Sequence, residues 1–520
     1  MTPPFNVLFV TIDQWRAEAL SARGHACLKT PNLDRLAAEG TLFLNHYAQA
    51  TPCSPGRASL YTGLYLHNHR VAVNGTPLDR RHGNVALEAR KAGYDPALFG
   101  YTDVSADPRA HHPDDPCLRS YEGILPGMTA VVPLDGEQLP WLAQLKAKGF
   151  DGPIDAVEVF RPRADYPGAA ERGPTYAPTR YAAEDSHTVY LTDEAIKYIA
   201  VRQARPWFVH LSYLSPHPYF VAPEPYNALY DVDAVPPIER APTLEAEAAQ
   251  HPWLAAFLPD QIGTPASVGL AMRDQVHLPE HALRQIRATY YGMVSEVDHE
   301  LGRLIEHLRE TGAYDRTLIV VVSDHGEQLG DHWMFGKYGY FDASFRVPLI
   351  VRDPRREADG GRGRQVAAFT ENVDVMPTIL DWLGLEAPAQ CDGLSLLPFC
   401  RGESPRHWRE EAHWAYDFRD LAGRRYGGRR LAPDQCVLNV IRGPRYKYVH
   451  FAALPPLFFD LQEDPQEFHD RAADPAYRSL VLDYAQKLIS WRMTHDERVL
   501  VNQSLTGDGV VEWHGPRHSA

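Results

Sequence analysis

Residues 6–13 read Asn6-Val-Leu-Phe-Val-Thr-Ile-Asp13, an almost unbroken apolar run that ends in a carboxylate. Such a run is typical of a strand buried on both faces of a parallel sheet. The following segment, 30–39, opens with Thr30 as a helix cap and Pro31 at the first helical position, and Gly40 ends it. A strand followed by a helix in this way predicts an α/β fold.

The same alternation recurs along the chain. Apolar runs followed by polar residues occupy 97–101, 207–213, 318–322 and 348–351. A long helix is predicted over about 282–308, because apolar residues recur there at spacings of three and four. We therefore expect a large, mostly parallel central sheet with helices on both faces.

The chain changes character after about residue 402. Candidate strands at 436–441 and 446–451, an aromatic segment at 457–461 and a closing helix near 477–492 predict a smaller α+β unit. We expect two units. They are a catalytic α/β domain over 1–402 and a C-terminal subdomain with a tail over 403–520.

Two long stretches, about 103–178 and 215–279, are rich in proline and lack a clear apolar period. We expect irregular loops here, and loops of this length in a compact protein usually shape a site.

The bulk composition narrows the classes of function. A formal net charge of -15 and the lack of a dense Lys/Arg tract argue against a nucleic-acid partner or an acidic membrane surface. The sequence contains no run of about 18 apolar residues, and Asp13 ends the first apolar stretch too early for a signal peptide. The six cysteines form no Cys-x-x-Cys pair. These features predict a cytoplasmic protein without a disulfide framework.

Polar residues stand just beyond the ends of several predicted strands, where α/β proteins bind their ligands. They are Asp13-Gln14, Thr102-Asp103, His217 and Asp324-His325. A single aspartate at such a place is most simply a helix cap or a turn residue. Two aspartates and a neighbouring histidine at equivalent places instead favour a site for Mn²⁺, Ca²⁺ or Mg²⁺.

The segment 51–65 carries a cysteine at the predicted start of a helix, with Cys53 before Pro55 and Arg57 one turn further on. A helix N-terminus favours an anion, and an arginine on the same face adds to that preference. The simpler interpretation of a single cysteine is a small buried apolar residue.

Two motifs in this chain resemble those of a known superfamily. Cys53-Ser-Pro-Gly-Arg57 matches the Cys-x-Pro-x-Arg signature of the type I sulfatases, in which a maturation enzyme oxidises the cysteine to formylglycine. The segment 323–332, followed by Gly336-Lys337 and Arg346-Val-Pro-Leu349, resembles the second signature of these enzymes, which belong to the alkaline phosphatase superfamily.

Finer detail makes the chain similar to the bacterial phosphonate monoester hydrolases, over about residues 5–495. The segments that carry this resemblance are Asp13-Gln-Trp-Arg16, Val73-Asn-Gly-Thr-Pro-Leu-Asp-Arg80, Gly100-Tyr-Thr102, Pro216-His-Pro218 and 449–460.

The resemblance implies a metal site. The ligands of one divalent ion, Mn²⁺ or Ca²⁺ in the first place, would be Asp13, Gln14, Asp324 and His325, with an oxygen of the hydrated formylglycine at position 53. Attack by that oxygen on the ester would give a covalent hemiacetal intermediate.

The family resemblance also implies roles for the neighbouring side chains. Arg57 would orient the nucleophile, and Lys337 and His217 would bind oxygens or protonate the leaving group. Simpler alternatives stay open, because Lys337 could be a surface charge, His217 a loop residue and Tyr101 part of the core. Substrate contacts would come from these four residues: Asn74, Tyr101, Thr102 and Asp103.

Asp103 departs from the pattern, because the phosphonate hydrolases carry a hydroxyl residue there. It could face the pocket, or it could turn away and leave Thr102 to supply the hydroxyl.

We therefore expect a hydrolase of phosphonate monoesters and phosphodiesters with side activity on sulfate esters. An arylsulfatase is the second hypothesis, and a binding protein without activity is the third. The expected partners are a small anionic ester, the maturation enzyme and further copies of the chain in a homotetramer.

Overall fold

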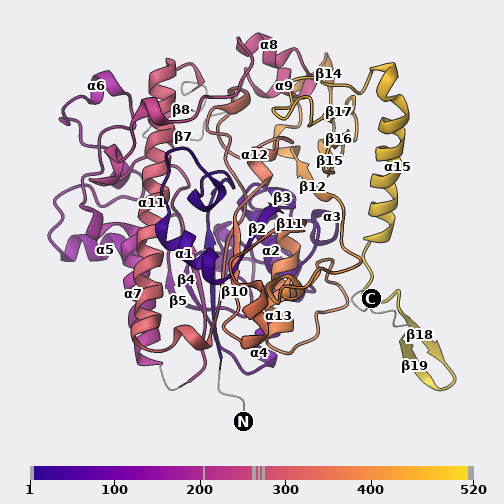
Figure 1. Cartoon of the computed structure of the whole chain (residues 1–520), viewed down its shortest axis with the longest axis horizontal. Coiled ribbons are helices and arrows are strands. Elements are labelled where there is room, and N and C mark those ends of the chain that lie inside the picture. The colour runs from indigo at the N-terminus through magenta and orange to yellow at the C-terminus, as the bar shows by residue number, and fades with distance from the viewer. Residues whose placement is uncertain (1–4, 203–204, 260–264, 268–269, 272–275, 513–520) are drawn as a thin grey trace.

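The computed structural model describes residues 5–202, 205–259, 265–267, 270–271 and 276–512. An eight-stranded sheet forms its centre (Figure 1). The strand order is β11 (Arg364–Glu371), β2 (Thr41–Tyr47), β10 (Leu349–Arg352), β9 (Thr317–Ser323), β1 (Asn6–Ile12), β6 (Phe208–Tyr213), β4 (Pro96–Gly100) and β5 (Thr129–Pro133). Strand β10 runs antiparallel to both neighbours and the other pairs are parallel, which confirms the predicted mostly parallel sheet.

Helices cover both faces of this sheet, as expected (Figure 1). Alternate residues of β1 show why, since Leu8 and Val10 belong to one apolar cluster whereas Val7 and Phe9 belong to another. The first cluster includes residues of α1 (Pro31–Glu39), α7 (His187–Val201) and α11 (Glu280–Glu310). The second includes residues of α2 (Cys53–Thr62), α4 (Val85–Lys91) and α13 (Val375–Trp382).

A second sheet lies beside the first and contains five strands. Its order is β17 (Leu457–Asp460), β16 (Tyr446–Phe451), β15 (Val437–Arg442), β12 (Ala412–Asp417) and β3 (Ala50–Thr51). Helix α15 (Arg478–Thr494) packs on it through Tyr484 and Leu488. The C-terminal unit therefore takes one edge strand from the N-terminal part of the chain, and the proposed division at residue 402 stays a prediction.

Three strands of the main sheet, β2, β5 and β11, were not predicted. Strand β5 is an edge strand with mostly exposed residues, and β11 is interrupted by a bulge between Val366 and Phe369, so neither carries a plain apolar run. The stretches expected to be irregular also contain helices α5 (Leu139–Ala147), α8 (Leu244–Ala248) and α9 (Pro252–Phe257).

Thr30 occupies the N-cap position of α1 and Pro31 begins the helix, as predicted. The Thr30 hydroxyl donates to Asp34, however, and makes no capping hydrogen bond. The remaining short elements are α3 (Leu66–His69), α6 (Ala169–Arg172), α12 (Asp342–Phe345), α14 (Leu397–Cys400), β7 (Pro265–Ser267), β8 (Leu270–Ala271), β13 (Arg425–Tyr426), β14 (Arg429–Arg430), β18 (Gln503–Thr506) and β19 (Gly509–Glu512).

In the described part of the chain, no helix combines the length and the apolar character needed to span a membrane. The last eight residues of the predicted tail, 513–520, lie outside the described residues.

Candidate active site

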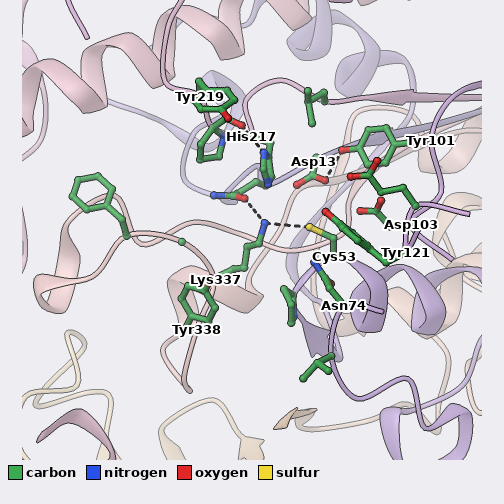
Figure 2. A pocket seen from close by; sticks show the side chains of 18 of the residues that line it. Asp13, Cys53, Asn74, Tyr101, Asp103, Tyr121, His217, Tyr219, Lys337 and Tyr338 are labelled. Atoms are coloured by element: carbon green, nitrogen blue, oxygen red, sulfur yellow. Dashed lines mark hydrogen bonds between the residues drawn. The ribbon is translucent and has the colours of Figure 1, made fainter. Parts of the chain in front are cut away.

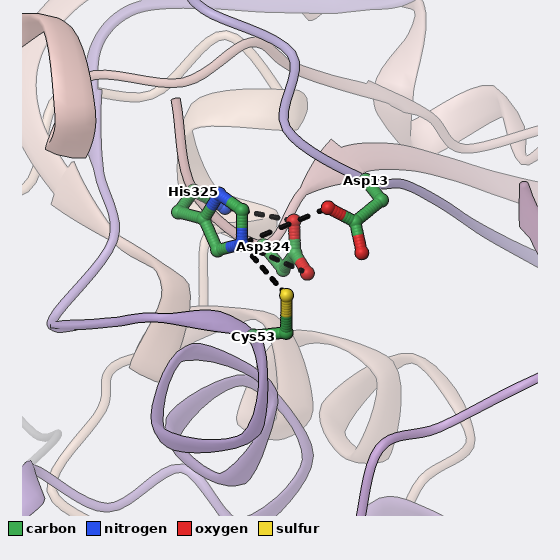
Figure 3. Close-up of side chains that lie close together, drawn as sticks. All are labelled: Asp13, Cys53, Asp324 and His325. Carbon is green, nitrogen blue, oxygen red and sulfur yellow. Dashed lines mark hydrogen bonds and ion pairs between the residues drawn. The ribbon is translucent and has the colours of Figure 1, made fainter. Parts of the chain in front are cut away.

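The predicted strand-end residues meet at one edge of the main sheet. Asp13 follows β1, Asp324 follows β9 and His217 lies beyond the end of β6. Because these three strands are parallel, their carboxyl ends point the same way and deliver the side chains to one place. Helix α2 begins at Cys53, as predicted, and directs its first residue to that place (Figure 3).

Four buried side chains gather here in a group that can hold a metal ion. One atom each from Asp13, Cys53, Asp324 and His325 lies within 4.8 Å of the others (Figure 3). Oδ1 of Asp13 is buried and has no hydrogen-bond partner among the described residues, which suits an atom that binds a cation. Two carboxylates and an imidazole form a donor set suited to a divalent ion, so the residues present fit the expected metal.

The orientation of His325 supports the same assignment. Its Nδ1 lies 3.2 Å from the carbonyl oxygen of Gly326, which can only accept a hydrogen bond. Nδ1 therefore carries the proton, and Nε2 faces Cys53 Sγ at 3.3 Å and Asp324 Oδ2 at 3.6 Å. A backbone carbonyl fixes many metal-binding histidines in this way.

Arg57 joins the two aspartates. Its Nε donates to Asp324 Oδ2 at 2.8 Å and its Nη2 donates to Asp13 Oδ2 at 3.1 Å. Its Nη1 also donates to Ser212 Oγ and to the carbonyl of Tyr101, and the guanidinium stacks over the Tyr101 ring. Within the described residues Arg57 thus positions carboxylates, whereas the sequence predicted that it orients the nucleophile.

Lys337 links the nucleophile position to Gln14. Its Nζ lies 3.1 Å from Cys53 Sγ and donates to Gln14 Oε1 at 2.6 Å. The amide nitrogen of Gln14 donates to Glu327, and Glu327 also accepts from the backbone of Gly336, next to the lysine. Glu327 therefore accepts hydrogen bonds from both Gln14 and the backbone next to Lys337, and so positions the Lys337–Gln14 contact.

Burial and neighbouring charges shift the pKa values of four groups in the site. Burial and the nearby Asp13 raise the pKa of Asp324 to about 6. Burial opposes ionisation of Asp13 as well, but His217 and Lys337 hold its pKa well below the ordinary value. Burial lowers the pKa of His217 to about 4 and that of His325 to about 3, so both imidazoles are neutral at pH 7.

A cavity of about 410 Å³ opens onto Asp13, Gln14 and Cys53 (Figure 2). Of the residues predicted to bind substrate, Asn74, Tyr101 and Asp103 line it, together with Lys337 and His217. Tyr101 also donates to Asp13 Oδ2 at 2.5 Å. Asn74 accepts a hydrogen bond from the backbone of Ser54 and so supports the start of α2.

Thr102 does not reach this cavity. Its hydroxyl donates to the carbonyl of Gly123 and accepts from the backbone of Leu125, and it faces a neighbouring hollow. The alternative in which Thr102 supplies a hydroxyl to the substrate therefore does not fit this structure, because that hydroxyl is already satisfied. Asp103, the other alternative, does face the cavity.

Several lining residues were not found from the sequence. Tyr219 and Phe220 directly follow Pro216-His-Pro218, and Tyr338 directly follows Gly336-Lys337, so their position beside a motif could have pointed to them. Tyr121, Glu122 and Asp420 come from segments without a motif.

Comparison with known proteins places this geometry in a family. The family model "Sulfatase" matches residues 5–385, and the model "N-sulphoglucosamine sulphohydrolase, C-terminal" matches residues 330–494. The multifunctional alkaline phosphatase superfamily protein PehA of Trinickia caryophylli is 44% identical over 514 residues, which cover 97% of this chain and 98% of PehA.

Two solved structures are similar along the whole chain. The phosphonate monoester hydrolase of Agrobacterium radiobacter has a TM-score of 0.93 and 46% identity, and it covers 98% of this chain and 100% of its own. The phosphonate monoester hydrolase SpPMH of Silicibacter pomeroyi has a TM-score of 0.89 and 39% identity, with 98% and 99% covered. This chain belongs to the sulfatase family of the alkaline phosphatase superfamily.

Proposed function

We propose that the protein is a metal-dependent hydrolase of phosphonate monoesters and phosphodiesters, with side activity on sulfate esters. The observation that carries the proposal is the meeting of Asp13, Cys53, Asp324 and His325 in one buried group, of which Asp13 and Cys53 line the cavity, with Lys337 beside the sulfur. The coarser statement, a hydrolase that acts on phosphonate or sulfate esters, agrees with the family and with the names of its relatives.

Asp13, Gln14, Asp324 and His325 would hold one divalent ion, Mn²⁺ or Ca²⁺. When bound, the ion would withdraw electrons from the reacting group and favour the ionised nucleophile. Position 53 would supply that nucleophile as formylglycine, made from Cys53 by a maturation enzyme. The two carboxylates balance the ion's charge, so an anionic ester can approach without the repulsion of a further carboxylate.

The chain's own residues would then position the ester. Lys337 Nζ lies 3.1 Å from Cys53 Sγ and would bind an anionic oxygen at this point. His217 has its Nδ1 against the carbonyl of Pro218, at 2.6 Å, so its Nε2 is left to face the cavity. Arg57 keeps Asp13 and Asp324 in place.

Three chromogenic substrates test this function: 4-nitrophenyl phenylphosphonate, bis(4-nitrophenyl) phosphate and 4-nitrophenyl sulfate. We expect the first two to have the higher kcat/KM, chelation to remove all three activities, and Mn²⁺ or Ca²⁺ to restore them. An Asp324→Asn variant should lose both activity and bound metal. A preference for the sulfate would instead identify an arylsulfatase, and inactivity of a preparation with converted Cys53 would indicate a binding protein.

A further inference from the structure

One carboxylate of the cavity stands apart from the others. Asp103 is 4% exposed and lines the cavity, yet its carboxylate makes no hydrogen bond and no ion pair with any described residue. The carboxylates of Asp13 and Asp324 share Arg57, and Glu327 is held by Gln14. A buried carboxylate without a partner is costly, so this position is suited to a ligand that supplies the missing charge.

The surroundings of Asp103 favour a cation. Glu122 also lines the cavity, and the aromatic rings of Tyr101 and Tyr121 lie on the same side of Cys53 as Asp103 (Figure 2). Carboxylates combined with aromatic faces are the groups that proteins use to bind ammonium and quaternary ammonium ions.

Positive and negative side chains lie on different sides of the cavity. Lys337, the cation nearest the nucleophile position, lies on the opposite side of Cys53 from Asp103 in Figure 2. An anionic phosphoryl or sulfuryl centre would sit at Cys53 and Lys337. A positively charged substituent would then extend towards Asp103.

We propose that the substrate is a zwitterionic ester, in which one organic substituent carries an ammonium or quaternary ammonium group that binds Asp103 and the aromatic rings. This inference rests on the function proposed above and specifies its substrate class. Burial raises the pKa of Asp103 to about 8, and a bound cation would favour its ionised form.

A matched pair of phosphodiesters tests the inference. Both carry a 4-nitrophenyl group, and the second group is either 2-(trimethylammonio)ethyl or its neutral isostere, 3,3-dimethylbutyl. We expect kcat/KM to favour the cationic diester by about tenfold or more, whichever ester bond is cleaved. Phosphorus NMR of the products records both cleavages.

The Asp103→Asn variant should bring this ratio close to one. The Asp315→Asn variant should keep it, because Asp315 is exposed and precedes β9 at the opposite edge of the sheet. The inference would be overturned if both diesters are hydrolysed and the ratio is near one in the protein without substitutions. It would also be overturned if the ratio is unchanged in Asp103→Asn. Failure to hydrolyse either diester or 4-nitrophenyl phenylphosphonate would instead overturn the proposed function.

A second measurement does not depend on a variant that folds. Choline and 3,3-dimethylbutan-1-ol are compared as inhibitors of the hydrolysis of the neutral diester. The inhibition constant of choline should be lower than that of 3,3-dimethylbutan-1-ol by about tenfold or more. Equal inhibition by the two alcohols would contradict a cation site at Asp103.

Discussion

At the scale of single residues, the guanidinium of Arg57 forms ion pairs with two buried aspartates, Asp13 and Asp324, and offsets their negative charge. A lysine has one ammonium group and cannot reproduce the hydrogen bonds to Asp13, Asp324 and Ser212 together. Arg57→Lys should therefore cost about 1–3 kcal/mol of unfolding free energy, because it leaves buried hydrogen-bond acceptors unsatisfied, and should weaken metal binding. Urea unfolding and metal analysis measure both effects.

The exposed Arg425 on β13 gives a matched control for this change. Arg425→Lys should leave the unfolding free energy within about 0.5 kcal/mol. Equal stability of the two variants would mean that Arg57 does not hold the aspartates as described.

Replacement of Cys53 should affect catalysis and leave stability nearly unchanged. Cys53→Ala should lower kcat by about three orders of magnitude or more, since only binding and electrostatics remain. Its melting temperature should change little, because the residue is small and stands at the first turn of α2. Near-normal turnover, or full activity with position 53 wholly in the thiol form by mass spectrometry, would contradict the nucleophile assignment.

Sequence reasoning finds residues of this site when a motif names them. Asp13, Cys53, Asp324 and His325 belong to such motifs, and the structure brings all four together. Glu327 lies inside the second motif, but its contacts with Gln14 and Gly336 depend on the path of the loop. Tyr121 comes from a loop without a motif, so no local pattern could join it to the cavity.

At the scale of elements, helix α11 contains a buried acid outside the active site. Glu296 is 3% exposed, and its Oε1 has no hydrogen-bond partner among the described residues. Burial raises its pKa to about 8, above the ordinary value of 4.5. The folded state therefore binds a proton that the unfolded state releases between these pH values.

This shift sets the direction of the pH dependence. The stability that protonated Glu296 contributes is complete below about pH 4.5 and is lost as the pH rises through 8. Glu296→Gln should reduce the fall in unfolding free energy between pH 5.5 and 8.5, by at most about 1.4 kcal/mol per pH unit. Urea unfolding at several pH values measures this slope. The exposed Glu306 on the same helix gives the control, and equal slopes for Glu306→Gln and Glu296→Gln would refute the effect.

The strength of the local pattern explains which elements were predicted. Strand β1 is buried along its whole length and α11 repeats its apolar positions over 31 residues, so both patterns are unambiguous. Strand β2 includes Asn45 and His46, and the buried His46 is satisfied by Thr370 and Asn372 from elsewhere in the chain. Such distant partners make a polar residue acceptable inside a sheet, and they are invisible in the local sequence.

At the scale of the whole molecule, the C-terminal region exposes apolar side chains. Leu482, Ile489 and Met493 are 57%, 59% and 71% exposed on α15, and Leu505 on the projecting β18–β19 hairpin is 86% exposed (Figure 1). Exposed apolar groups gathered in one region mark contact surfaces. We therefore expect this region to help assemble the homotetramer that the family resemblance implies.

Light scattering tests this assembly. The full chain should give about 234 kDa, four times 58.5 kDa, and deletion of residues 499–520 should lower that mass. Deletion of residues 513–520 alone is the control, because it leaves the hairpin intact. A full-length chain that is monomeric would contradict the prediction.

Strand β3 has a consequence for the order of events during synthesis. Ala50, three positions before Cys53, pairs with Ala415, which lies 365 positions later in the chain (415 minus 50). At about 5–20 residues per second a ribosome needs roughly 20–70 seconds to make that interval. Until then the segment before Cys53 has no strand to pair with, and an enzyme that must reach this side chain before folding buries it has about that long to act.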